Sequence, residues 1–234
     1  MKTHRIILAV LASVLMAACG PNSKVDFNYA HPERYTAGNA TIGQPVSKIS
    51  VDWYGGIIDI RQADRTDLRI WEESDTTLSD TLRMQHYVDQ DGELNIRFCK
   101  NGKYHHTLLK RLNKHLTIEV PRGLVLDEIE FNNVSGVVRI DSVQCRQMEA
   151  NAVNSAVDAA WPIVPDGIEI NGVNTTTTLY VPSTAGMTIE MNAVNSDIAS
   201  ELPVRKADKK TILGDGHCEV EINAVNGSLN IKQL

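Results

Sequence analysis

The chain has 234 residues, with 23 Lys and Arg against 29 Asp and Glu, which gives a formal net charge of −6. This length allows one large domain or two small ones, and a hydrophobic fraction of 42% excludes a disordered chain. The acidic balance disfavours nucleic acid as a partner. Only 5% of the residues are aromatic, and the second half is rich in Val, Ile, Thr and Asn, which favours regular β structure.

The N-terminus has the layout of a secretory signal peptide. Lys2 and Arg5 precede a short apolar run that is too short to span a bilayer. The run ends in Leu15-Met16-Ala17-Ala18-Cys19-Gly20, which matches the lipobox of bacterial lipoproteins. We predict that residues 1–18 are removed and that acyl chains on Cys19 anchor the protein to a membrane. The alternative is an ordinary signal peptide followed by an incidental cysteine.

Residues 19–47 are expected to form the lipidated cysteine and a flexible tether, because they combine several Pro and Gly residues with no sustained periodicity. Some Bacteroidota-type lipoproteins carry an acidic cluster after the cysteine that directs them to the outer face. Here the corresponding stretch is Gly20-Pro21-Asn22-Ser23-Lys24. The sequence therefore favours an outer-membrane anchor that faces the periplasm over one that is displayed at the cell surface.

Residues 48–234 are predicted to form one β domain, with a leading β segment over 48–120 and repeat coils over 121–234. Alternating residues in Ile49–Trp53 and Ile57–Ile60, separated by Gly55-Gly56, predict two strands about a tight turn. Further strands are predicted at Leu68–Trp71, Met84–Val88, Glu93–Phe98 and His115–Val120.

The second half contains an internal repeat of Glu, an apolar residue, Asn, any residue, Val, and Asn or Ser. The first Asn of the five copies falls at Asn132, Asn151, Asn171, Asn192 and Asn223. The steps are 19, 20, 21 and 31 residues, so the last contains an insertion, expected within Leu202–Gly214. Short β-runs with this period predict an all-β β-solenoid with coils of about 20 residues. We expect these Asn at the corners, where they tolerate a left-handed backbone and form a ladder from coil to coil.

The five Glu residues of the repeat would form a column of carboxylates. Such a column either holds divalent cations or a cationic ligand, or is a solvated face. Calcium sites need several convergent oxygens for each ion rather than one from each coil, which favours the solvated face. No metal and no other cofactor is therefore predicted.

Three internal cysteines, Cys99, Cys145 and Cys218, would lie in an oxidising compartment, and an odd number cannot all pair. At most one internal disulfide can form. The alternative is that all three are small buried hydrophobic residues.

One basic segment interrupts the acidic chain, because no acid occurs between Glu93 and Glu119. Lys110, Arg111 and Lys114 are its candidate ligand contacts, with an anionic glycan, a lipid A-like phosphate or the headgroup layer as the ligand. The alternative is a solvated loop between two strands.

The residues from Lys48 to Leu234 resemble the putative-adhesin family of β-strand-repeat domains, a domain of unknown function common in bacterial envelope proteins. The resemblance is carried by the opening Ile49–Ile60, the Val120-Pro121 step and the closing stretch from Gly214-Asp215-Gly216 to Ile231. It implies a single-stranded, right-handed β-solenoid (β-helix-like) that acts in adhesion or surface binding at the envelope. The family brings no catalytic residues to carry over.

The function predicted from the sequence is a lipid-anchored, non-enzymatic envelope protein that binds an envelope, glycan or protein ligand. An alternative is an envelope-stress accessory protein that recruits a regulatory partner, as some relatives of the resembling family suggest. A more remote alternative is a polysaccharide-active enzyme, because β-solenoids include lyases and hydrolases whose sites spacing alone cannot exclude. The sequence contains none of the H-E-x-x-H, G-x-S-x-G or G-x-x-x-x-G-K-[ST] motifs.

Overall fold

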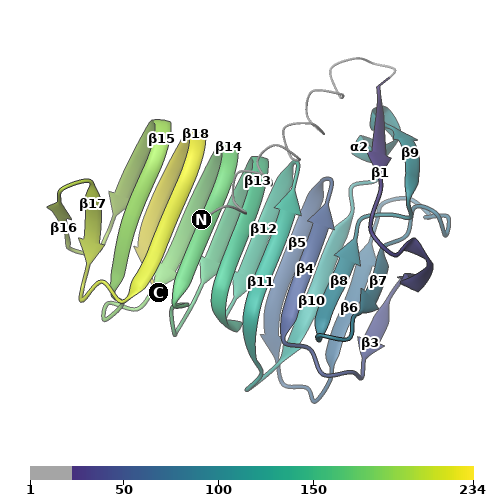
Figure 1. Cartoon of the computed structure of the whole chain (residues 1–234), viewed down its shortest axis with the longest axis horizontal. Coiled ribbons are helices and arrows are strands. Elements are labelled where there is room, and N and C mark those ends of the chain that lie inside the picture. Colours follow the sequence, from purple (N-terminus) through teal and green to yellow (C-terminus); the bar gives the residue numbers. More distant parts are fainter. Residues whose placement is uncertain (1–22) are drawn as a thin grey trace.

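The computed structural model describes residues 23–234, so the lipobox and Cys19 lie outside the described residues. Apart from a 3-10 turn, η1 (Pro32–Arg34), and one short helix, α2 (His106–Arg111), the regular structure is all strand, which confirms the all-β prediction (Figure 1). Within this part of the chain, no helix has the length and apolar character needed to cross a bilayer.

The strands up to Pro121 are called the leading strands, and those after it the repeat strands. The leading strands are β1 (Lys24–Phe27), β2 (Thr36–Ala37), β3 (Ala40–Ile42), β4 (Lys48–Trp53), β5 (Gly56–Ala63), β6 (Leu68–Glu73), β7 (Gln85–Val88), β8 (Glu93–Arg97), β9 (Gly102–His105) and β10 (His115–Pro121). The repeat strands are β11 (Val125–Asn133), β12 (Gly136–Asp141), β13 (Gln144–Ala160), β14 (Gly167–Val181), β15 (Met187–Ser200), β16 (Val204–Ala207), β17 (Lys210–Leu213) and β18 (Cys218–Gln233).

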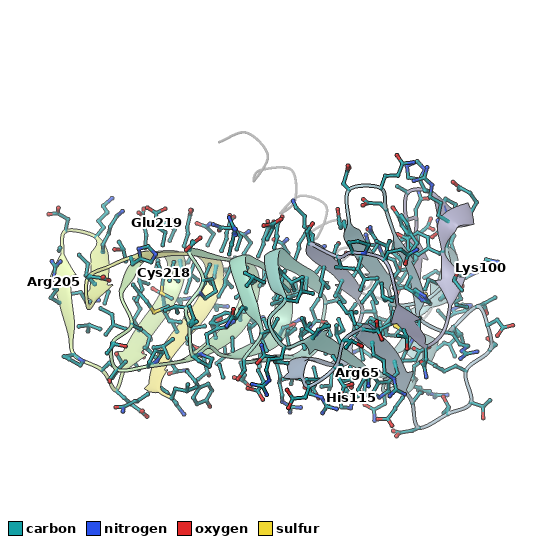
Figure 2. All side chains as sticks on the ribbon, turned by 90° about the horizontal axis from the view of Figure 1, so that it is seen from below. Arg65, Lys100, His115, Arg205, Cys218 and Glu219 are labelled. Atoms are coloured by element: carbon teal, nitrogen blue, oxygen red, sulfur yellow. The ribbon has the colours of Figure 1, made fainter. Side chains whose placement is uncertain are left out.

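Sixteen of these strands form one curled, open sheet. The long strands β13, β14, β18 and β15 pair in parallel along most of their length. On the other side of β13, two shorter strands pair with it in parallel: β11 with its first part and β12 with its second part. From there the sheet splits: one branch runs from β11 through β4, β8 and β7 to β2, and the other from β12 through β5, β10 and β6 to β3. Figure 2 shows two layers of ribbon with side chains filling the space between them.

The period-2 alternation of the strands builds one continuous core between these layers. In β11, for example, Ile129 and Phe131 are fully buried, and the intervening Glu130 points to the outer face. Two glycines allow the close approach of β12 and β5, the first two strands of the second branch, where they are direct partners. Gly136 has a φ of 134° and lies so close to Gly56 that an added Cβ would come within 2.0 Å of the Gly56 carbonyl oxygen.

The order of the repeat strands differs from the order along the chain. The C-terminal β18 pairs with β14 on one side and β15 on the other, so the fifth repeat lies between the third and the fourth. The strand order therefore does not confirm the predicted solenoid, in which each coil would stack on the preceding one. The insertion expected within Leu202–Gly214 forms the hairpin β16–β17, which pairs with the first four residues of β15.

The predicted flexible tether is largely part of the folded domain. Between residues 24 and 42, β1 pairs with β9, β2 pairs with β7, and β3 pairs with β6. Phe27 of β1 packs among Tyr54, Phe98 and Tyr104 with ring centroids 6.0–6.2 Å apart. This segment folds onto the domain because β1 buries apolar side chains at alternate positions. That alternation covers only four residues, so the sequence pattern is masked by the surrounding Pro and Gly residues.

Candidate binding surface

The five repeat glutamates lie in one row across the outer face of the sheet. They are direct partners in the parallel register, in the spatial order Glu130, Glu149, Glu169, Glu221 and Glu190. Adjacent strands are about 4.8 Å apart, so each carboxylate has a like charge on the neighbouring strand. Burial raises the pKa of Glu130, and the charge of Glu149 adds to that rise. We call this set the glutamate row.

A row of asparagines lies beside the glutamate row, two residues further along each strand. In four of the strands the Asn Nδ2 donates a hydrogen bond to the Glu Oε1 of the same strand. The distances are 3.2 Å for Asn132 and Glu130, 3.0 Å for Asn151 and Glu149, 2.8 Å for Asn171 and Glu169, and 3.1 Å for Asn223 and Glu221. These amide donors stabilise the carboxylates against the repulsion of their neighbours.

The same asparagines are also linked from strand to strand. Asn171 donates to the Oδ1 of Asn151 at 3.2 Å, Asn223 to that of Asn171 at 3.1 Å, and Asn192 to that of Asn223 at 3.2 Å. At the other end, Asn132 donates to Asp52 at 2.7 Å. The row runs within the strands rather than at corners, and none of its members has a positive φ.

The left-handed backbone expected at the first Asn of the repeat occurs instead at the second. Asn154 has a φ of 48° and Asn174 a φ of 55°. A second ladder joins this position: Asn174 donates to Asn154 at 2.7 Å, Asn226 to Asn174 at 2.6 Å and Asn195 to Asn226 at 2.8 Å. The sequence carried the signal, because this position of the motif is Asn in four of five copies. A shallow polar hollow of about 400 Å³ lies over these residues.

A groove of about 360 Å³ follows one end of the glutamate row, over β14, β18 and β15. Its acidic lining includes Glu169, Glu190, Glu219 and Glu221. Two basic groups edge it: the Lys210 ammonium lies 3.6 Å from Glu190, and the His217 ring lies 3.7 Å from Asp166. The groove is open and acidic, so it favours neutral or cationic ligands over anionic ones.

The three basic residues predicted as ligand contacts separate in the structure. Lys110 and Arg111 are exposed in the last turn of α2, at the opposite end of the sheet from the groove. The structure contradicts the prediction that Lys114 contacts a ligand, because its ammonium group is fully enclosed and lies 2.6 Å from the Glu72 carboxylate. It also donates to the carbonyls of Leu82 and Phe98 and lies over the rings of Trp53 and Phe98. Its side chain holds the core together and cannot reach a ligand at the surface.

The three internal cysteines are free and buried, with no disulfide between them. Burial raises the pKa of each thiol to about 12. No group of three or more His, Cys, Asp or Glu side chains within residues 23–234 is arranged to hold a metal ion.

No protein-family model matches the chain, and no curated protein matches it. A solved structure does. A putative cell adhesion protein from Clostridium sporogenes ATCC 15579 superposes with a TM-score of 0.68 at 16% identity, over 86% of this chain and 100% of that one.

This match shows a shared fold. Two further solved structures align less closely: a putative adhesin from Bacteroides fragilis NCTC 9343, with a TM-score of 0.39, 16% identity and 85% and 97% coverage of this chain and that chain, and a putative adhesin from Parabacteroides merdae ATCC 43184, with a TM-score of 0.36, 14% identity and 85% and 81% coverage.

Proposed function

We propose that this protein is a lipid-anchored, non-enzymatic binding protein of the bacterial cell envelope with an adhesin-like role. The observation that carries the proposal is the outer face of the sheet, where carboxylate and amide groups repeat in register across neighbouring strands. A surface of this kind offers the same hydrogen-bonding pair at each strand. That regularity suits an extended ligand with repeating hydroxyl or amino groups, such as a glycan strand.

Two other observations support the proposal. The lipobox ending at Cys19 predicts an acyl anchor, and two or three acyl chains provide stable attachment where a single chain is marginal. The fold is shared with a protein that has been described as a putative cell adhesion protein. Fold alone does not establish function, so the binding face has to be tested directly.

The binding face is tested with the variant Glu169→Gln/Glu221→Gln, which removes two charges from the groove and keeps oxygens that accept the Asn hydrogen bonds. The matched control is Glu33→Gln/Glu73→Gln, which removes the same charge from exposed positions elsewhere. Binding to isolated envelopes of the native host and to a panel of purified polysaccharides is measured by co-sedimentation. We expect the groove variant to lose at least tenfold in affinity, corresponding to about 1.4 kcal/mol, and the control to bind as the wild type does. Equal binding by both variants would contradict the proposed face.

The side of the membrane is tested by protease treatment of intact and lysed cells of the native host. We propose an outer-membrane anchor facing the periplasm, because no acidic export cluster follows Cys19. The protein should then be digested only after lysis, together with a periplasmic control. Digestion in intact cells would instead show surface display and direct the search to ligands outside the cell.

A further inference from the structure

The first described residues lie against the short helix. β1 pairs antiparallel with β9, with Lys24 opposite His105 and Phe27 opposite Gly102. The backbone N–H of His106, the first residue of α2, donates to the Ser23 carbonyl at 3.1 Å. Figure 1 shows β1, β9 and α2 gathered at one end of the molecule. The chain therefore enters the domain beside α2.

This end of the molecule presents five exposed cations, although the chain as a whole is acidic. They lie on β1, β9, α2 and the connection between β8 and β9. They are Lys24, Lys100, Lys103, Lys110 and Arg111. We call this set the basic end.

Few acids face the basic end. Asp26 lies 3.4 Å from Lys103 and compensates part of its charge. Asp80 lies 3.9 Å from Arg83 on the neighbouring segment, and Asp75 accepts a hydrogen bond from Asn113 at 2.5 Å. The basic end therefore keeps a net positive charge.

One apolar side chain accompanies these cations. Leu108 of α2 is 40% exposed, and its neighbour Leu109 is buried beneath the helix. An exposed leucine beside cations binds favourably at a membrane interface. The apolar side chain enters the boundary between headgroups and acyl chains, and the cations contact anionic lipids.

The sequence places the predicted anchor within reach of this surface. Cys19 is five positions before Lys24, and five residues span at most about 18 Å when fully extended. The strand that follows is fixed, because Phe27 packs in the aromatic cluster with Tyr54, Phe98 and Tyr104. An acylated Cys19 would therefore hold the basic end close to the headgroup layer.

We propose that the basic end docks on the anionic lipid surface in which the Cys19 acyl chains are inserted, with Leu108 at the interface. This inference rests on the acylation of Cys19 proposed above. Docking holds the long axis of the sheet away from the membrane, since α2 and the groove over β14, β18 and β15 lie at opposite ends of the molecule. The acidic groove is thereby presented away from a surface that would repel it.

The test uses a fluorescent probe on Leu108→Cys in the full-length protein purified from envelopes. Selective labelling is possible because the internal thiols are buried and their pKa is raised to about 12. The matched control is a probe on Val194→Cys, at the other end of the sheet, where the native side chain is 79% exposed. Both proteins are reconstituted into vesicles that contain phosphatidylglycerol and a lipid-attached quencher.

We expect quenching at position 108 and none at position 194. Replacement of phosphatidylglycerol by phosphatidylcholine, addition of salt, or the variant Lys110→Gln/Arg111→Gln should each reduce the quenching, because each cation near an anionic surface contributes about fivefold in partition. Equal quenching at the two positions on membrane-bound protein would overturn the docking proposal.

The anchor and the docking surface can fail separately. If the purified protein does not float with vesicles, the proposed acylation fails. The Leu108→Cys and Val194→Cys proteins are then remade with Cys19→Ser, because an unacylated Cys19 would also react with the probe, and are mixed with excess phosphatidylglycerol vesicles. Quenching at position 108 alone would still support docking on anionic lipid, and its absence would overturn it.

Discussion

The Lys114 ammonium group lies 2.6 Å from the Glu72 carboxylate in the interior of the leading segment, with the two side chains 0% and 4% exposed. Burial lowers the pKa of Lys114, and the neighbouring Glu72 carboxylate opposes that change. Glu72 also accepts a hydrogen bond from the backbone N–H of Met84 at 2.6 Å. The pair therefore joins β6, the segment before β7 and the residue that precedes β10.

Removal of one member of this pair should be strongly destabilising. Lys114→Ala leaves the Glu72 charge buried without its partner, and we expect the free energy of unfolding to fall by about 3–5 kcal/mol. Urea denaturation followed by circular dichroism measures the change. The control Lys110→Ala, at an exposed position, should change stability by less than about 0.5 kcal/mol. A loss of similar size in both variants would contradict the structural role of Lys114.

The second asparagine ladder, formed by Asn154, Asn174, Asn226 and Asn195, should contribute to stability through both its backbone and its hydrogen bonds. Asn174 has a φ of 55° and is linked to Asn154 and Asn226. Asn174→Ala should lose about 1–3 kcal/mol, because alanine adopts the left-handed conformation at a cost and forms no ladder. Asn174→Gly keeps the backbone freedom and should lose about 1 kcal/mol or less. Thermal melting of the two variants would contradict this account if the glycine variant were the less stable.

The three buried thiols should make stability depend on pH in the alkaline range. The pKa of each is raised from its ordinary value of 9.0 to about 12, so the folded state keeps protons that the unfolded state releases. The resulting stability is fully present below pH 9 and is lost as the pH rises towards 12. Urea titrations at increasing pH should show a falling midpoint, with a smaller fall in the Cys145→Ala variant than in the wild type. An identical pH dependence in both proteins would argue against a buried, protonated Cys145.

The glutamate row should be dispensable for folding. Glu169→Gln/Glu221→Gln relieves like-charge repulsion between adjacent strands and keeps acceptors for Asn171 and Asn223. We expect the melting temperature to remain unchanged or to rise. A marked fall would mean that the carboxylates stabilise the sheet, and the binding test with this variant would then need a single-site change such as Glu221→Gln.

The periodicity of the sequence predicted which repeat residues are equivalent, but not which strands are neighbours. Glu169 and Glu221 are direct partners in the sheet although they are 52 positions apart, because β18 lies between β14 and β15. A repeat pattern determines the side chains that match between strands, and every order of equivalent strands satisfies it. The position of the insertion could be predicted from the sequence, because the hairpin β16–β17 is an addition to an otherwise nearly constant period.

The charged residues of the leading segment show a second feature that the sequence does not predict, namely which of them are buried. The run from Arg97 to Lys114 reads as uniformly basic, yet Lys114 points into the core towards Glu72, which is 42 positions earlier in the chain. Arg97 likewise pairs with Asp52 at 3.2 Å, whereas Lys110 and Arg111 remain exposed. Local composition cannot separate these cases, since the partner of each buried charge comes from a distant strand.

Acylation at Cys19 can be measured as the intact mass of the protein isolated from its native host. We predict a chain that begins at Cys19 and carries the added mass of a diacylglyceryl group, with or without a third acyl chain. A chain that retains residues 1–18, or one that begins at or after Cys19 without acyl groups, would contradict the proposed anchor.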